Sequence, residues 1–447
     1  MTIKIALISL GCARNLVDSE VILGTLKKSG YKITDSPSGA DIAIVNTCSF
    51  IEDAKKESIE AILDLIELKG RKKLKGIIVA GCLPQRYGKE LSAELDEVDG
   101  FVGVDAANRL PSLIKSLALG RKSDIILRES RYLYNDRSPR LSLTPKHYAY
   151  VKISEGCSHR CSFCIIPAIR GPHRSRTAGS VLKESRRLIA KGVKEINIIG
   201  QDTSIYGKDI YGRYSLAPLL RKLSRLEGAN WIRLLYGHPD HITDELISAI
   251  SEEANICKYL DIPIQHISGK ILKAMGRPAT GAHIRDLISR IRKRIPGVAL
   301  RTSLIVGFPG EGEREFGELK DFVKEARFER LGAFKFSAEE GTAAARMEGQ
   351  VPEKAKASRW EEIMSIQQRI SEKINRSIIG RELDVLIDEP DPSDKGVFLG
   401  RSYMDAPEID GTVFVRGTGI KAGDMVKVRV IDGYEYDLVA EKLQRRQ

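Results

Sequence analysis

Apolar runs alternate with amphipathic stretches along the N-terminal part of the chain. They predict strands at 4–11, 41–47, 76–81 and 100–104, and helices at 17–29 and 52–69. This alternation is typical of a parallel sheet with helices on its faces, whose ligands bind beyond the carboxyl ends of the strands. Cys12, Cys48 and Cys82 each follow one of the first three runs. We therefore expect these cysteines to converge at one edge, although any one of them could be an ordinary buried cysteine.

A second alternation of strands and helices occupies the middle of the chain. Strands are predicted at 149–154, 195–199, 232–236, 259–263, 299–306 and 331–336, with helices between them, for example at 180–191 and 282–294. Six such units are too few to close an eight-stranded barrel, so we expect a partial, open barrel. Polar groups that follow the strands should face its open end: Gln201, Asp202, His238, Gln265, His266, Ser303 and Glu311.

The C-terminal part combines one polar helix with short strands. The helix is predicted at 353–376, and strands separated by turn signals follow at 382–388, 397–401, 411–416, 425–432 and 437–443. That spacing predicts a small antiparallel β-barrel. The sequence thus predicts an α/β multidomain protein with domains at 1–120, 147–375 and 376–447. The charged stretch 121–146, which carries two prolines, is expected to be a linker.

Composition and hydropathy indicate the cellular location of the protein and the kind of partner it binds. No apolar run approaches the roughly 18 residues that span a membrane, and the N-terminus lacks the pattern of a signal peptide. We therefore expect a cytoplasmic protein with reduced cysteines, whose roles are metal binding or catalysis. The net charge of +12 suggests a nucleic-acid or ribonucleoprotein partner, and a generally basic proteome is the alternative.

Cys157, Cys161 and Cys164, spaced C-x3-C-x2-C, follow the first strand of the second alternation. Three thiolates on one loop can hold three irons of a cubane cluster and leave the fourth iron open. A structural zinc site needs four ligands, and three cysteines cannot form disulfides without a leftover thiol. The triplet resembles the signature of radical S-adenosylmethionine (SAM) enzymes. In these enzymes the open iron binds SAM, and electron transfer cleaves SAM to a 5′-deoxyadenosyl radical.

The two cysteine triplets together resemble the methylthiotransferase family, over essentially the whole chain. The resemblance rests on SLGCARN at 9–15, DSE at 18–20 and the loop 156–171, with Arg14 where the family more often has Lys. It implies an N-terminal cluster domain, a radical-SAM barrel and a C-terminal TRAM barrel. It also implies SAM as methyl donor and radical source, and two 4Fe–4S clusters, held by Cys12, Cys48 and Cys82 and by Cys157, Cys161 and Cys164.

Further candidates for SAM or substrate contact are weaker. The resemblance implies that Phe163, beside Cys164, packs near the adenine, and plain core packing is the alternative. Gln201, Gln265, His266 and Ser303 lie at predicted strand ends, where polar residues either meet a ligand or cap the following helix. Cys257 has no partner at either triplet's spacing, so we predict an ordinary core cysteine.

Three motifs select a branch of the family. QDT at 201–203, YLDIP at 259–263 and DAPEIDG at 405–411 resemble the enzymes that modify an aspartate of a ribosomal protein. Residues 381–447 hold ten Lys and Arg against fourteen Asp and Glu, a net charge of −4, so the remainder carries +12 − (−4) = +16. An acidic barrel suits a basic ribosomal protein better than RNA, unless its acids are merely solvated.

This branch implies transfer of a methylthio group to the β-carbon of an aspartate in small-subunit ribosomal protein number twelve. Acid–base catalysis gives roughly 10²–10⁴-fold, too little for such an unactivated C–H bond, so a cofactor-derived radical is the sensible route. A one-electron reductant, a sulfur donor and possible contact with ribosomal RNA are the further partners expected. The alternatives are the tRNA-adenosine branch, which shares all six cysteines, and a non-enzymatic iron–sulfur carrier.

Overall fold

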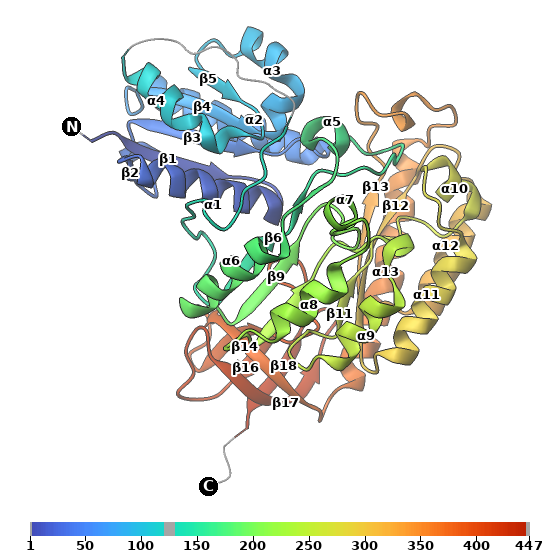
Figure 1. The fold of residues 1–447 in the computed structure, drawn as a ribbon. Helices are drawn as coiled ribbons and strands as arrows, with labels where there is room; N and C mark the ends of the chain where they lie inside the picture. Colours follow the sequence, from blue (N-terminus) through green and yellow to red (C-terminus); the bar gives the residue numbers. More distant parts are fainter. Residues whose placement is uncertain (1, 120–129, 444–447) are drawn as a thin grey trace.

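A five-stranded parallel sheet forms the N-terminal part of the computed structural model, which describes residues 2–119 and 130–443 (Figure 1). The strand order is β2-β1-β3-β4-β5. The strands are β1 (Lys4–Ser9), β2 (Lys32–Ile33), β3 (Ile42–Thr47), β4 (Gly76–Gly81) and β5 (Gly100–Val102). The helices are α1 (Ala13–Lys28), α2 (Glu52–Gly70), α3 (Cys82–Glu94) and α4 (Leu110–Ala118).

Both faces of this sheet are buried, which explains why its strands are apolar runs without polar alternation. Successive side chains of a strand point to opposite faces. Ile42 and Ile44 accordingly pack with residues of α1 and α4, whereas Ala43 and Val45 pack with residues of α2 and α3. The strands therefore end together at one edge, where Cys48 and Cys82 directly follow β3 and β4 and Cys12 follows β1 after two residues.

Six parallel strands form the partial barrel in the middle of the chain. They lie in two sheets, β10-β9-β6 and β11-β12-β13, and the Ile232–Ile256 bridge joins β10 to the segment that leads into β11. Their bounds are β6 (Tyr148–Lys152), β9 (Glu195–Ile199), β10 (Trp231–Leu234), β11 (Tyr259–Asp261), β12 (Ala299–Val306) and β13 (Arg330–Lys335). A short ladder, β7 (Ser154–Glu155) with β8 (Arg174–Ser175), follows β6.

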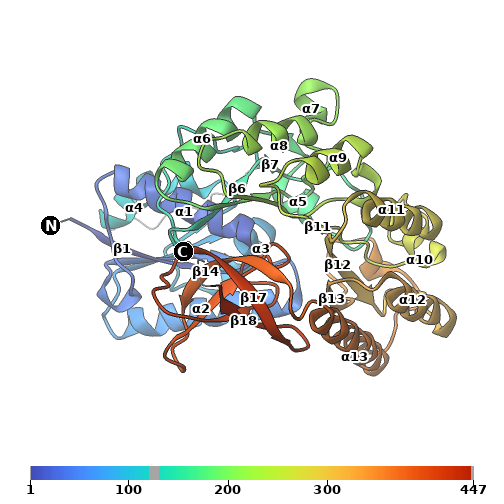
Figure 2. The same cartoon turned by 90° about the horizontal axis from the view of Figure 1, so that it is seen from below.

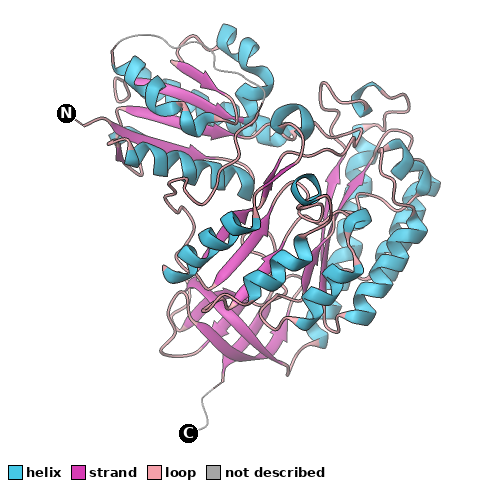
Figure 3. Ribbon diagram, in the orientation of Figure 1, coloured by secondary structure: helices cyan, strands magenta, loops and turns pink. Residues whose placement is uncertain are grey.

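Helices connect these strands; the longer ones cover the outside of the arc (Figures 2 and 3), whereas the short helix after the cysteine loop lies at the end that meets the N-terminal sheet (Figure 1). They are α5 (Ile166–Arg170), α6 (Ala178–Ala190), α7 (Lys208–Tyr211), α8 (Leu216–Ser224), α9 (Asp244–Glu252), α10 (Gly269–Ala274), α11 (Gly281–Arg294), α12 (Glu313–Ala326) and α13 (Glu353–Ser377). The largest core cluster fills the space between these helices and the strands. Cys257 is buried with Trp231 and Tyr259, as the sequence predicted for a core cysteine.

The C-terminal strands close into a five-stranded barrel in the order β14-β15-β16-β18-β17. They are β14 (Glu382–Pro390), β15 (Val397–Arg401), β16 (Val413–Arg416), β17 (Met425–Gly433) and β18 (Leu438–Lys442). Four junctions are antiparallel, whereas β16 and β18 pair in parallel. The parallel junction, which the sequence prediction lacked, arises because β17 reverses the chain between them.

This small barrel packs against the end of the β6–β13 strands opposite the N-terminal sheet (Figure 1). Glu195, the first residue of β9, accepts hydrogen bonds from Arg233 at 2.7 Å and from Arg401 of β15 at 2.6 Å. Asp405 pairs with Arg330, and Asp410 pairs with Arg301. The acidic run 405–411, one of the motifs that resemble the aspartate-modifying branch, thus contributes two of its carboxylates to docking the barrel.

The connection between the N-terminal sheet and β6 is only partly described. Residues 121–129 of the predicted linker 121–146 lie outside the described residues, and the part at 130–146 has neither helix nor strand. Arg140 in this part forms ion pairs with Glu20 of α1 and Glu184 of α6. Within the described ranges, none of the helices combines the length and apolarity required to cross a membrane.

Candidate functional site

Cys157, Cys161 and Cys164 lie on the loop between β7 and α5, and backbone hydrogen bonds hold this loop in place. Cys157 N donates to Gly171 O at 3.0 Å, and Ser162 N donates to Met275 O at 2.9 Å. Gly156 has φ +76°, and a Cβ there would lie 2.2 Å from Pro172 O. A glycine is therefore required at the start of the loop.

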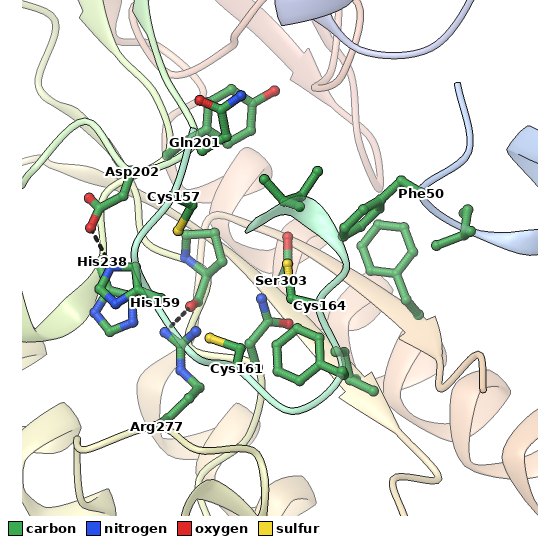
Figure 4. Close-up of a pocket in the computed structure, with 18 of the residues that line it drawn as sticks. Phe50, Cys157, His159, Cys161, Cys164, Gln201, Asp202, His238, Arg277 and Ser303 are labelled. Atoms are coloured by element: carbon green, nitrogen blue, oxygen red, sulfur yellow. Dashed lines mark hydrogen bonds and ion pairs between the residues drawn. The ribbon is translucent and has the colours of Figure 1, made fainter. Parts of the chain in front are cut away.

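A cavity of about 410 Å³ opens beside this loop (Figure 4). All three cysteines of the loop line it, together with Phe163, Gln201, Gln265 and Ser303, four of the five weaker candidates that the sequence offered for ligand contact. Further lining residues come from the N-terminal domain, namely Arg14, Phe50 and Ile51. The cavity volume lies within the range of roughly 300–1,000 Å³ that is usual for small-molecule sites.

Three of these four candidates are held in different ways. Phe163 also packs against the cluster of Phe308 and Phe336, so it joins core and cavity. The Gln201 amide donates to Glu155 Oε1 at 2.7 Å. Gln265 has φ +69°, a left-handed conformation that is uncommon for a non-glycine residue and concentrates at functional sites.

Two other strand-end residues face away from the cavity. His266 is fully buried, with its Nε2 3.3 Å from Glu311 Oε2. Glu311 also accepts from Gly307 N and from Arg359 at 3.0 Å. The sequence prediction that His266 and Glu311 face the open end is therefore wrong, because both are used in binding the turn after β12 to α13.

The N-terminal cysteines converge as the strand ends converge. A Cβ on Gly11 would lie 2.6 Å from Cys48 Cβ, which brings the residue next to Cys12 onto Cys48. Cys82 begins α3 directly after Gly81, whose φ of +98° directs the chain from β4 into the helix. Arg170 of α5 donates to Cys82 Sγ at 3.5 Å, so the middle domain reaches this group of thiols.

Burial and nearby guanidiniums set the acidity of these thiols. Burial raises the pKa of Cys48 and of Cys164 to about 12, and that of Cys157 to about 11. Burial alone would raise the pKa of Cys12 as well, but Arg14 and Arg170 outweigh it and lower that pKa to about 7. Thiols that resist ionisation by themselves are stabilised as thiolates when they bind a metal.

His159 and His238 form part of one wall of the cavity (Figure 4), and His241 packs against both. The rings of His159 and His238 stack with centroids 4.2 Å apart, and His241 lies 5.1 Å from both. Asp202 Oδ2 lies 2.7 Å from His159 Nε2 and 2.9 Å from His241 Nδ1. His159 therefore ties the cysteine loop to the turn after β9, a contact that the sequence did not reveal.

Arg277 is a further lining residue that sequence reasoning missed. It follows α10, donates to Pro263 O at 2.9 Å and interacts electrostatically with the Cys161 thiol. Its Nε is buried without a partner among the described residues. The only sequence signal was a basic residue in the turn GRP, which is too common to select it.

Ion pairs join the N-terminal domain to the middle domain around both groups of cysteines. Lys152 and Arg170 both pair with Asp18 of α1 and with Glu155 of β7. Arg86 of α3 pairs with Glu339 at 2.8 Å. These buried pairs orient α1, which begins immediately after Cys12, against the cysteine loop.

The donors fit two iron–sulfur clusters of the open kind. Each group offers three thiols, all free of disulfides, and thiolates are the ligands that such clusters take. One group borders a cavity large enough for a small molecule. The fold and these donors define a radical-SAM type of protein with an additional three-cysteine domain.

Comparisons with known proteins agree with this class. Three family models match the chain: the Uncharacterized protein family UPF0004 over residues 4–103, the Radical SAM superfamily over 151–323 and the TRAM domain over 379–442. The radical SAM methyltransferase TsrM of Kitasatospora setae superposes with a TM-score of 0.56 at 16% identity, over 74% of this chain and 73% of that chain. At this identity the likeness concerns the fold alone.

Relatives of full length are far more similar. Proteins named ribosomal protein uS12 methylthiotransferase RimO are 49% identical in Geotalea uraniireducens (strain Rf4), over 98% of both chains. Those of Desulforamulus reducens are 48% identical over 99% of this chain and 100% of theirs, and those of Caldanaerobacter subterraneus are 50% identical over 98% and 99%. The chain belongs to the RimO family of radical-SAM methylthiotransferases.

Proposed function

We propose that this protein transfers a methylthio group to the β-carbon of an aspartate in ribosomal protein uS12. The observation that carries the proposal is a three-thiol loop lining a cavity whose wall the N-terminal domain completes, while Arg170 of the same middle domain contacts the second three-thiol group. Full-length relatives at 48–50% identity that are named for uS12 support this substrate over tRNA adenosine.

Cys157, Cys161 and Cys164 would hold the 4Fe–4S cluster that binds and cleaves SAM. Cys12, Cys48 and Cys82 would hold a second 4Fe–4S cluster, which supplies or presents the sulfur. When bound, these groups supply the electron and the sulfur that the chain's own side chains cannot provide. Phe163, Gln201, Gln265 and Ser303 would contact SAM from the cavity wall.

The protein's own residues would bind and orient the reactants. Arg277 lies beside Cys161 and has an unpartnered Nε, so it suits the α-carboxylate of SAM. The pairs of Lys152 and Arg170 with Asp18 and Glu155 fix the N-terminal domain against the loop, which sets the distance between the two groups of thiols. Small errors in such positioning reduce rates strongly.

The remaining partners follow from this chemistry. The reaction requires a one-electron reductant and a sulfur donor, and the TRAM domain supports contact with ribosomal RNA. We also propose a cytoplasmic location, where uS12 is made and assembled. The proposed domains are 1–120, 147–375 and 376–447, with 121–146 as the linker.

One incubation tests the proposal. The iron- and sulfide-reconstituted protein would be incubated without oxygen with SAM, a reductant and either uS12 or bulk tRNA, and the products read by mass spectrometry. We expect a methylthio group on one aspartate of uS12. A methylthioadenosine in tRNA, with uS12 unmodified, would overturn the substrate while keeping the chemistry.

A further inference from the structure

Four basic side chains line the cavity, and they differ in what balances their charge. Arg301 pairs with Asp261 at 3.0 Å and with Asp410 at 3.3 Å, and Lys335 pairs with Glu353 at 2.6 Å. Arg14 and Arg277 form no ion pair with a carboxylate of the described residues. Two guanidiniums are therefore available for negative groups of ligands, and they lie at different places.

Arg14 is held rigidly although it lacks a carboxylate partner. Its Nη1 donates to Gly200 O at 2.9 Å, across the boundary between the N-terminal and middle domains. Its Cζ lies 4.4 Å from the centroid of the Tyr236 ring, and Tyr236 takes the uncommon φ of +61° at this position. A guanidinium has five N–H donors, and the hydrogen bond to Gly200 uses one of those of Arg14.

Arg14 lies between the two groups of cysteines. It is the second residue after Cys12 and interacts electrostatically with that thiol, while its half-buried side chain lines the cavity together with Cys157 and Cys164. Arg277, in contrast, interacts electrostatically with Cys161 on the loop itself. A carboxylate bound at Arg14 would therefore lie on the side of the cavity nearest the N-terminal thiols.

We propose that Arg14 binds the side-chain carboxylate of the substrate aspartate and so selects this residue for modification. The inference rests on the proposed function, which supplies an aspartate as the group to be modified. In that residue the β-carbon is bonded directly to the carboxylate carbon. Fixing the carboxylate against Arg14 thus holds the β-carbon beside Cys12, between the SAM-binding side and the sulfur-presenting side.

Arginine suits this role for two physical reasons. Its planar fork matches a carboxylate with two parallel hydrogen bonds, and it remains charged at any relevant pH. The ring of Tyr236 and the carbonyl of Gly200 fix the plane of the fork in advance, so little side-chain freedom is lost on binding. Asparagine at the same substrate position would lose the charge and one of the acceptors.

Binding of uS12 variants to cluster-loaded full-length protein tests this. The probes are purified uS12 with either Asp or Asn at the modified position, and the readout is the ratio of their Kd values without turnover. We expect the wild type to prefer Asp by roughly tenfold or more, the scale of a charge-assisted hydrogen bond. Arg14→Gln should bring the ratio close to one, and Arg14→Lys should keep an intermediate preference.

Controls separate charge selection from general effects. Lys335→Gln removes another positive charge from the same cavity, and we expect it to leave the Asp/Asn ratio unchanged. Iron and sulfide content, measured for every variant, reports whether Arg14→Gln still loads both clusters. If Arg14→Gln does not load, the comparison of wild type with Arg14→Lys decides.

Two negative results have different meanings. If the wild type modifies uS12 but binds the Asp and Asn forms alike, or if Arg14→Gln keeps the preference for Asp, the role of Arg14 is overturned while the proposed function stands. An unchanged preference in a loaded Arg14→Lys variant also contradicts carboxylate recognition by the fork. If the wild type binds neither form and modifies tRNA instead, the proposed function falls and this inference falls with it.

Discussion

The two ends of the partial barrel are joined to their neighbouring domains in opposite ways. At the end that carries the small barrel, buried carboxylates and guanidiniums match one another, as in the contacts of Glu195 with Arg233 and Arg401. At the end that carries the N-terminal domain, ion pairs around Asp18 and Glu155 lie beside the two groups of thiols, and two guanidiniums of the cavity have no carboxylate partner among the described residues.

This difference separates a structural joint from a joint that binds ligands. A buried charge is costly unless it is paired, so an interface that serves only docking contains its own partners. Guanidiniums held without carboxylates are consistent with negative groups that arrive with ligands. The cavity lies at the joint with the N-terminal domain. Arg14 and Phe50 of that domain form part of its wall.

The largest expected effect comes from a substitution at the joint that binds ligands. Cys161→Ala removes one of three thiols on the loop after β7, so we expect no measurable 5′-deoxyadenosine from SAM under reducing conditions. Cys257→Ala is the matched control, because Cys257 is buried in the core and should leave cleavage intact. Retained 5′-deoxyadenosine production in Cys161→Ala would contradict the assignment of this loop to SAM cleavage.

Cys48→Ala separates the roles of the two groups of cysteines within the same joint. Since Cys48 belongs to the N-terminal group, we expect SAM cleavage to continue while methylthiolated product is lost. The measurement is the ratio of 5′-deoxyadenosine to modified uS12 by mass spectrometry. Normal product from this variant would mean that the N-terminal cysteines are only structural.

Glu195→Gln tests the structural joint. The change leaves Arg233 buried without a carboxylate and Arg401 with Asp388 alone, which should cost about 3–5 kcal/mol of unfolding free energy. Urea unfolding followed by circular dichroism measures this. Arg290→Gln, which breaks only exposed ion pairs with Asp244 and Asp286, should change the stability by about 0–1 kcal/mol. Equal effects of the two substitutions would contradict a closed, matched joint.

The smallest expected effect is on pH dependence. Against the effect of burial, Arg401 and Arg233 hold the pKa of Glu195 below its usual value. Its stabilising contribution is therefore complete above the unfolded pKa of about 4.3 and is lost as pH falls through the lower folded pKa. Between about pH 4.5 and 3 we expect stability to fall less steeply in Glu195→Gln than in the wild type. Parallel pH profiles would show that Glu195 does not contribute to this slope.

Pattern in the sequence was sufficient for most of the architecture. The strand predicted at 299–306 coincides with β12, and the helix predicted at 353–376 differs from α13 by one residue at its end. Local periodicity predicts these elements because a helix or a strand buries side chains at a regular spacing along the sequence. The parallel junction of β16 and β18 was missed, because pairing between distant strands leaves no local periodic signal.

Candidate site residues were predictable where they follow strands or share a short spacing. Gln201, Gln265 and Ser303 line the cavity, whereas His266 points away to meet Glu311. The direction of a polar side chain at a strand end depends on the backbone dihedral angles of that residue. No local sequence pattern specifies these angles. The role of the acidic run 405–411 in docking depended in the same way on arginines far away in the chain.

By itself, the sequence determined the class of chemistry and the order of the parts. Thiols at fixed spacing and at successive strand ends specify their ligands through short-range geometry. Only the tertiary structure decided which charges neutralise one another within the protein and which remain for ligands. Arg14, Arg277, Arg301 and Lys335 are alike as basic residues of the sequence, but Coulomb interactions depend on distance in space, and the fold alone sets those distances.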